Sequence, residues 1–401
     1  MPVNSSQFKL LVAVFFCLTV IYPVPSCRSA KQNTKQFYQE TLALFDAAAP
    51  GFGVDTGEKE TPLDYPMTYA LYASAEAHRA SASKDKQALE NAVGAARWLT
   101  EHNDLDNDGQ IGWGLPFAWD AFGDGSVNPP NTEGAITTAL VIQALLDTWD
   151  AIEECGYDET QLRQQLLDNA IGAFRTFQNS YEVTPSGLVF FYSNHPNDSK
   201  RYVINTHSML TGQFQRLSTY PIPGNYQPEI EMLTEAGFNY LDNHKLRDSA
   251  GVIYFNYSDP VPEGKATRPN DSCHEMYTLQ GILDYQLYSQ TDTPIINTSE
   301  AARNIERFLE KSRVREFPLG TEYPPSYQSI LDRPARLWGI GYLLYLSSRL
   351  GLDNLADAFF EILLTQYKQQ GTLILRPDLE DANFYPRYAA HALFGLSYYA
   401  Y

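Results

Sequence analysis

The chain has few cysteines and little positive charge, and it lacks the local motifs of several common enzyme classes. Among its 401 residues are 4 cysteines, and only Cys155 and Cys273 lie beyond the first 30 positions. That number excludes a disulfide framework and a paired-cysteine metal site, although one bridge between the two remains open in an exported protein. There is no phosphate-binding glycine loop, dinucleotide fingerprint, zinc-protease motif or serine-hydrolase elbow, so we expect no organic cofactor.

Positive charge is scarce as well: 29 Lys and Arg stand against 48 Asp and Glu, which gives a formal net charge of −19. Such a chain offers no basic field to a nucleic acid, and none to an anionic membrane surface. Aromatic residues, by contrast, are plentiful, with 27 Tyr and 21 Phe. A composition of 44% hydrophobic residues is sufficient for a large folded core.

The N-terminal residues predict an export signal. Residues 10–22 read LLVAVFFCLTVIY and follow Lys9. This run is too short to cross a bilayer as a helix and is typical of the apolar centre of a signal peptide; no later run has the length of a membrane span. We therefore expect residues 1–30 to be a signal peptide and residues 31–401 to be periplasmic or secreted, with a lipoprotein anchored through Cys27 as the alternative.

Apolar residues recur at helical spacing in twelve segments, and these segments are of two alternating kinds. One kind is apolar on most faces, which predicts a buried helix, and the other has a charged stripe, which predicts an exposed one. The buried helices are expected at 66–82, 132–153, 203–218, 271–289, 333–350 and 383–400. The exposed helices are expected at 35–49, 86–101, 159–179, 226–243, 298–312 and 353–368. Six such pairs predict an all-α fold, an (α/α)6 toroid, whereas a superhelical solenoid of helix pairs is the alternative.

Loop lengths predict where the functional face lies. Connections into the buried helices are long and those leaving them are short, so the long loops and the first turns of all six buried helices should surround one funnel. Short β-like runs at 187–193 and 251–258 predict hairpins on its rim. No shift in composition divides the chain, so residues 31–401 are expected to form a single domain.

Acidic residues near the starts of the buried helices are candidates for catalysis. Glu133 and Asp120 are expected on one wall of the funnel, and Asp271 or Glu275 on the other, with His274 beside them. Opposed carboxylates can share the roles of acid and of base or nucleophile, because neighbouring acids raise one another's pKa. Capping of the helix N-termini is the alternative explanation for such residues.

Aromatic, amide, histidine and arginine side chains near the same helix starts are candidates for substrate binding. They are Trp113, Trp119, Tyr69, Asn205, His207, Tyr277, Arg336, Tyr385 and Arg387. Rings beside carboxylates suit a carbohydrate, whose C–H faces stack on rings and whose hydroxyls bond to acids. The alternatives are that the rings pack onto the core, that His207 is a buried core histidine, and that the arginines pair with the site's own acids rather than with a substrate carboxylate.

A possible metal site lies in the loop before the second buried helix. Asp104, Asp106 and Asp108, followed by Gly109, match the first part of a calcium-binding loop. Leu115 stands where such a loop has its bidentate Glu, so this is not an EF-hand. We expect a structural Ca²⁺ that stiffens the loop, with a hydrogen-bonded turn cluster as the alternative.

Several stretches resemble the substrate-facing helix starts of (α/α)6-toroid enzymes of polysaccharide processing. They are GWGLPFAWDAFGDG leading into NTEGAITTAL, VINTHSML, NDSCHEMYTLQGIL and FYPRYAAHALFGL. Glycoside hydrolases, polysaccharide lyases and the helical domain of glucuronyl C5-epimerases have this architecture. The resemblance covers nearly the whole mature chain but matches no single family, so it implies a class of enzyme and assigns no catalytic residue.

Three functions follow as hypotheses, each with an oligo- or polysaccharide as the partner. Paired carboxylates favour a glycoside hydrolase. The second hypothesis is a lyase or C5-epimerase of uronates, with Tyr277, His207 or His274 as base and with Arg336 and Arg387 against the substrate carboxylate. The third is a non-catalytic glycan-binding protein, which would have an aromatic groove without opposed ionisable groups. The sequence does not determine the oligomeric state.

Overall fold

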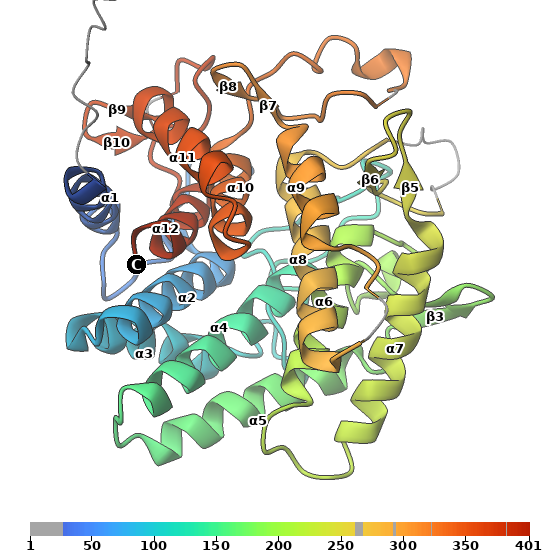
Figure 1. Cartoon of the computed structure of the whole chain (residues 1–401). Coiled ribbons are helices and arrows are strands. Elements are labelled where there is room, and N and C mark those ends of the chain that lie inside the picture. The colour runs from blue at the N-terminus through green and yellow to red at the C-terminus, as the bar shows by residue number, and fades with distance from the viewer. Residues whose placement is uncertain (1–26, 261–267, 292–293, 322, 382) are drawn as a thin grey trace, which may run out of the picture.

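Six helices form a closed inner ring, as the alternating pattern predicts (Figure 1). The computed structural model describes residues 27–260, 268–291, 294–321, 323–381 and 383–401. Its inner helices are α2 (Pro66–Ser83), α4 (Ala135–Glu154), α6 (Ile204–Leu217), α8 (Ser272–Ser289), α10 (Leu337–Arg349) and α12 (Pro386–Ala400). Each inner helix packs against the next, and α12 packs back against α2. This closure confirms the toroid and excludes the open solenoid.

The exposed helices form an outer layer around this ring. They are α1 (Cys27–Leu42), α3 (Lys86–Glu101), α5 (Thr160–Phe177), α7 (Gln227–His244), α9 (Thr298–Glu306) and α11 (Asp353–Ile362), the last continuing as a π-helical turn over Leu363–Tyr367. Their charged stripes face solvent, while their apolar stripes pack on the inner helices.

Tertiary pairing explains two differences from the predicted helix ends. α10 begins at Leu337 rather than at 333, because Pro334 pairs with Arg315 as an isolated β-bridge and holds the chain extended. α9 stops at Glu306, several residues early, because the following residues enter a strand pair. α1 also spans Cys27–Leu42 rather than 35–49, and its end is followed by tight turns.

Short antiparallel strand pairs occupy five of the six connections from an outer to an inner helix. They are β1–β2 (Phe52–Gly53 and Leu63–Asp64), β3–β4 (Tyr181–Thr184 and Gly187–Phe190), β5–β6 (Leu246–Arg247 and Ile253–Tyr254), β7–β8 (Leu309–Glu310 and Arg313–Val314) and β9–β10 (Lys368–Gln369 and Thr372–Leu373). The two predicted hairpins correspond to the pairs ending in β4 and β6. The other three consist of two-residue strands, which are too short to show an alternating pattern. The α3–α4 connection holds the aspartate-rich loop instead.

The predictions of a signal peptide and of no later membrane span concern different parts of the chain. The apolar run at 10–22 lies outside the described residues, so the signal peptide and the Cys27 anchor stay predictions. Among the described residues, α4 alone has the length and composition of a membrane-spanning helix, but 78% of that stretch is buried in the protein. Burial on all sides is what an inner-ring helix requires.

The two remaining cysteines are free thiols. Cys273 is buried in the first turn of α8, whereas Cys155 caps the C-terminal end of α4. A helix of 20 residues is about 30 Å long, so the two sulfurs lie toward opposite ends of the ring. The bridge that the sequence left open is therefore not formed.

Glycines let the inner helices touch backbone to backbone. A Cβ at Gly281 of α8 would lie 2.1 Å from the carbonyl oxygen of Ser208 in α6. A Cβ at Gly395 of α12 would lie 2.2 Å from the carbonyl oxygen of Gly341 in α10. Since neither backbone can move without moving a whole helix, these contacts fix the tightest pairs of the ring.

This arrangement predicts opposite effects for two Gly-to-Ala changes. Gly281→Ala should destabilise the protein by about 1–3 kcal/mol or more, because it overpacks the α6–α8 contact. Gly94→Ala, on the exposed face of α3 with no atom within 4 Å of its added Cβ, should stabilise it by about 0.5–1 kcal/mol. Urea unfolding of both variants beside the wild type checks this; stabilisation by Gly281→Ala would contradict the close packing.

Candidate active site

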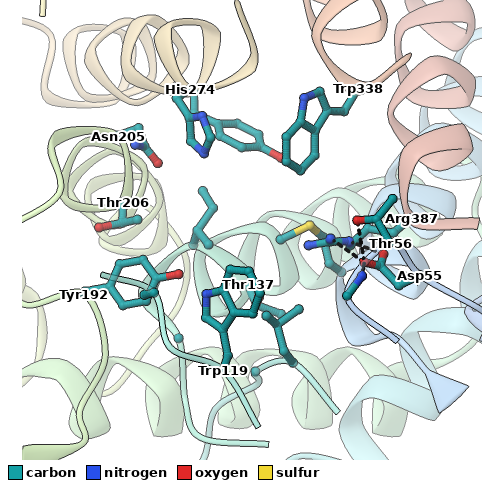
Figure 2. Close-up of a pocket in the computed structure, with 18 of the residues that line it drawn as sticks. Asp55, Thr56, Trp119, Thr137, Tyr192, Asn205, Thr206, His274, Trp338 and Arg387 are labelled. Carbon is teal, nitrogen blue, oxygen red and sulfur yellow. Dashed lines mark hydrogen bonds and ion pairs between the residues drawn. The ribbon is translucent and has the colours of Figure 1, made fainter. Parts of the chain in front are cut away.

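All six inner helices begin at the same end of the ring, around one cavity of about 540 Å³. Each contributes at least one side chain from its first turns: Met67, Thr137, Asn205, His274, Trp338 and Arg387. The loops before these helices supply the remaining walls. The predicted funnel is therefore present (Figure 2), and its volume lies within the range of small-molecule sites.

A histidine and an aspartate in the first turn of α8 form a hydrogen-bonded pair at this cavity. Asp271 is the N-cap of α8, and its Oδ1 accepts the backbone N–H of His274 at 3.1 Å. Its Oδ2 lies 2.7 Å from His274 Nδ1. Asp271 thus caps the helix and also orients the imidazole. With Nδ1 held by Asp271, the Nε2 atom of His274 is left for the cavity, into which the ring projects (Figure 2).

The electrostatic surroundings keep Asp271 ionised. Burial alone would raise the pKa of Asp271, but His274, Arg336 and Arg268 together outweigh it and hold that pKa well below its usual range. An ionised Asp271 can stabilise a positive charge that develops on His274. The pair therefore has the chemistry of an oriented general base.

Three arginines line the cavity, and two of them are already engaged. Arg387 forms a bidentate pair with the buried Asp55, at 2.7 and 2.8 Å. Arg336 Nε lies 3.1 Å from Glu316 Oε1 behind the wall. Arg268 differs: its guanidinium lies 3.9 Å from the ring centroid of Tyr257 and 6.0 Å from that of Tyr327, and its side chain forms no hydrogen bond or ion pair with the described residues.

A tyrosine lies one helical turn below His274. The Tyr277 hydroxyl is 2.5 Å from His391 Nε2, and His391 Nδ1 is 2.6 Å from the carbonyl oxygen of Arg387. Burial lowers the pKa of His391 to about 3, so this ring is neutral, donates from Nδ1 to the carbonyl and accepts from Tyr277. Burial also raises the pKa of Tyr277, which therefore keeps its proton at the cavity.

Aromatic and amide groups complete the walls. Trp119 and Tyr192 lie across the cavity from His274 and Trp338 (Figure 2). Trp119 is 40% exposed, as a platform for a sugar ring would be. Asn205 of α6 is 1% exposed and lines the cavity, and no described residue forms a hydrogen bond with its Nδ2.

Of the predicted carboxylates, only Asp271 lines the cavity. The carboxylate of Asp120 accepts four backbone N–H groups of its own loop, from residues 122–125, and these bonds lower its pKa. Glu275 is buried against α9, where it accepts hydrogen bonds from Asn270 and Asn304. Glu133 is buried beneath the aspartate-rich loop. Burial raises the pKa of both glutamates to about 7, but neither side chain faces the cavity.

The predicted binding residues divide into two groups. Those that line the cavity are Trp119, Asn205, Tyr277, Arg336 and Arg387. Those packed elsewhere are Trp113, Tyr69, His207 and Tyr385, all at most 2% exposed. The indole N–H of Trp113 donates to the carbonyl of Leu99, and the His207 ring bridges the backbone of Phe190 and Gly237. These four side chains are therefore packed inside the protein, as the alternative explanation from the sequence predicted.

Sequence reasoning missed several cavity residues, among them Asp55, Arg268, Tyr192, Tyr257 and Trp338. Two of them carried a signal. Each longer hairpin run ends in a Tyr-Ser pair, Tyr192-Ser193 and Tyr257-Ser258, and each serine forms a β-bridge beside the start of an inner helix. Each tyrosine is thereby held at the cavity wall. Asp55 and Arg268 lie in loops whose sequence gives no such repeat.

The predicted metal residues lie together but away from the cavity. Carboxylate oxygens of Asp104, Asp106 and Asp108 all lie within 4.8 Å of one another. None of the three lines the cavity.

Several solved structures of glycan-processing enzymes are similar to this chain. An α-1,6-mannanase from Salegentibacter sp. has a TM-score of 0.58 and 9% identity over 92% of this chain and 98% of that chain. An unsaturated glucuronyl hydrolase specific for heparin has values of 0.56 and 12%, over 92% and 96%. A polysaccharide lyase has 0.54 and 12%, over 92% and 97%. No protein-family model matches the chain, and no curated protein matches it in sequence. At these identities the likeness shows the shared (α/α)6-toroid fold.

The buried Glu275 predicts a pH-dependent stability. Its folded pKa is about 7 against an ordinary 4.5, so its contribution to stability is present below about pH 4.5 and is lost as pH rises through 7. Glu275→Gln cannot ionise and should avoid a loss of about 3 kcal/mol. The difference in unfolding free energy between variant and wild type should grow from pH 4.5 to 7 in urea titrations; a constant difference would contradict the raised pKa.

Proposed function

We propose that this protein is a uronate-specific polysaccharide lyase, exported by the signal peptide predicted over residues 1–30. The observation that carries the proposal is the Asp271–His274 pair facing a cavity in which the side chain of Arg268 forms no ion pair with any of the described residues. Abstraction of the C5 proton of a uronic acid requires a base and a cation against the carboxylate. Both are available at this cavity.

In the proposed reaction, His274 is the base. Its Nδ1–H stays donated to Asp271, and its Nε2 takes the C5 proton of the uronate. The electrons of the C5–H bond form a C4=C5 double bond while the C4–O bond of the glycosidic link breaks. Tyr277 lies one turn further along α8, with its ring centroid 6.4 Å from that of His274; its hydroxyl turns away from His391 Nε2 and gives its proton to the departing oxygen. One helix face would thus supply both the base and the acid.

Charge in the cavity supports an acidic substrate. The whole chain has a net charge of −19, which opposes a polyanion in bulk solution. Among the residues that line the cavity, however, three arginines stand against two carboxylates, Asp55 and Asp271, while Glu316 pairs with Arg336 from behind the wall. Arg268 is the donor left to bind a substrate carboxylate and to stabilise the negative charge that develops on it.

Hydrolysis, the first hypothesis from the sequence, has weaker support at this site. It needs a protonated carboxylic acid opposite a second carboxylate. Both oxygens of Asp55 are bonded to Arg387, and the pKa of Asp271 is lowered rather than raised. Three glutamates, Glu133, Glu275 and Glu316, have raised pKa values, and none of them lines the cavity. A purely glycan-binding role would leave the oriented His274–Asp271 pair without a task.

The first test measures the reaction itself. Uronate-containing and neutral polysaccharides are incubated with the protein, and both reducing ends and the ultraviolet absorbance of unsaturated sugars are recorded. We expect absorbance to rise with uronates alone, and His274→Ala to lower kcat by about 10²–10⁴-fold, since a general base contributes that much. Asp271→Asn, which retains an N-cap, should lower kcat without unfolding α8. Reducing ends without absorbance would support hydrolysis and overturn the proposal.

A second test concerns substrate binding. Arg268→Ala should raise KM for a uronate-containing glycan at least tenfold, because a bidentate bond to the carboxylate is lost. Arg333→Ala is the matched control, since Arg333 is exposed and does not line the cavity. Equal KM values for the two variants and the wild type would exclude Arg268 from carboxylate recognition.

A further inference from the structure

A serine, a histidine and an aspartate meet beside the outer helix α7, and none of the three lines the cavity. Ser186 lies in the turn between β3 and β4, His244 is the last residue of α7, and Asp259 follows β6. Ser186 Oγ is 3.0 Å from His244 Nε2, and His244 Nδ1 is 2.9 Å from Asp259 Oδ2. Each ring nitrogen therefore contacts one of the other two side chains, which is the connectivity of a nucleophile, its base and the group that orients the base.

Close packing of the β3–β4 turn on α7 holds the serine in place. Gly187 follows Ser186 with a φ of +133°, and a Cβ on it would lie 2.4 Å from the carbonyl oxygen of Ala236 in α7. The backbone N–H of Ser186 donates to Thr184 Oγ1 at 3.2 Å, and the carbonyl oxygen of Ser186 accepts from Asn243 Nδ2 at 3.1 Å. Because both backbone groups of Ser186 are bonded, its side chain keeps one position beside the last turn of α7.

The ring of His244 is also held in one orientation. Tyr240, one turn earlier in α7, stacks on it with the ring centroids 4.0 Å apart. The Tyr240 hydroxyl donates to the backbone carbonyl oxygen of Asp259, so one side chain positions both partners. The C-terminal end of a helix stabilises positive charge, as does the carboxylate of Asp259. Both favour the imidazolium that forms when His244 takes a proton.

The hydrogen bonds around the serine are satisfied together when its proton points to the histidine. An ionised Asp259 can only accept, so Nδ1 of His244 is the donor and Nε2 of the neutral ring is an acceptor. Thr184 Oγ1 lies 3.0 Å from Ser186 Oγ, but it also lies 3.0 Å from the carbonyl oxygen of Gly187, to which it donates. The Ser186 hydroxyl is therefore the donor that His244 Nε2 requires.

We propose that Ser186, His244 and Asp259 form a second catalytic site, which hydrolyses carboxylic esters. Ser186 Oγ attacks the carbonyl carbon of the ester while its proton passes to His244 Nε2. The C–O bond to the alcohol then breaks, and the alcohol leaves with that proton. His244 next takes a proton from a water molecule, whose oxygen attacks the acyl-serine. The carboxylic acid is released, and Ser186 regains its proton from His244.

The surroundings of the triad favour esters carried by a sugar. Asn243 Nδ2 is the amide donor beside the nucleophile that can turn to the oxyanion, and a single donor suits an ester better than the less reactive amide. The side chains of His244 and Asp259 are 19% and 29% exposed, so solvent reaches the group. Tyr257, two residues before Asp259, lines the cavity. An O-acylated glycan is therefore the expected substrate; this choice of alcohol rests on the glycan-processing function proposed above, whereas the triad itself does not.

A fluorophosphonate probe, which reacts with activated serines, and p-nitrophenyl acetate test the triad on the full chain without any glycan. We expect one label per chain, mapped to Ser186 by mass spectrometry of peptides. Ser186→Ala and His244→Ala should each lower ester hydrolysis about 10²-fold or more, since a general base contributes that much. Ser180→Ala is the matched control: this half-buried serine directly before β3 bonds to the carbonyl oxygen of Thr176, and its loss should leave labelling and hydrolysis unchanged.

The wild-type chain alone can overturn the proposal, because an unlabelled Ser186 means that its hydroxyl is not activated and that the three side chains only tie the hairpin to α7. Hydrolysis at the wild-type rate in Ser186→Ala or His244→Ala overturns it as well. Circular dichroism verifies folding. If an alanine variant does not fold, Asp259→Asn keeps the size of the side chain but favours the wrong tautomer of His244, and it should slow labelling and hydrolysis at least tenfold. Unchanged rates in that variant would contradict the triad.

Discussion

Direct backbone contact between inner helices is the constraint on which the rest of this structure depends. The glycines of α6, α8, α10 and α12 allow that contact, and closure of α12 against α2 leaves no free edge in the ring. Because every inner helix runs in the same direction, closure brings six N-termini to one cavity. Their N–H groups and the positive ends of their dipoles add to the arginines, so the fold itself favours a negatively charged ligand there.

Pairing of charges then decides which groups are available for chemistry. Arg387 with Asp55, and Arg336 with Glu316, are each satisfied within the protein and stiffen the walls. Within the described residues, the guanidinium of Arg268 contacts the rings of Tyr257 and Tyr327 and forms no ion pair, so a substrate carboxylate can bind it without first breaking one. The same comparison separates His274, which Asp271 orients toward the cavity, from His207, whose two ring nitrogens are both occupied by the backbone.

The sequence predicted the ring and the end of the ring at which the cavity lies, but it predicted only part of the site. The reason is geometric. Where a helix starts determines how far along the ring axis each of its residues lies. The direction in which a side chain points depends instead on its position in the helix, because each residue turns by 100°. His274 and Tyr277, three apart, share a face, but Glu275 is one step round and points to α9. Asp55 and Arg268 reach the cavity from loops whose paths no periodicity describes. For that reason the two glutamates were attractive candidates in the sequence, yet both lie outside the cavity.

The aspartate-rich loop completes a comparison among the six connections that enter the inner ring. Five of them contain a pair of short antiparallel strands, whose backbone hydrogen bonds join two parts of the connection before the next inner helix begins. The α3–α4 connection, described throughout, has the isolated bridges Trp119–Asn128 and Gly134–Ser193 in place of a strand pair. This connection also supplies more of the residues that line the cavity than any other connection does, and the exposed Trp119 is one of them. In this connection the carboxylate of Asp104 accepts the backbone N–H groups of Asp108 and Gly109, and that of Asp120 accepts four more, so side-chain hydrogen bonds do there what strand pairing does elsewhere.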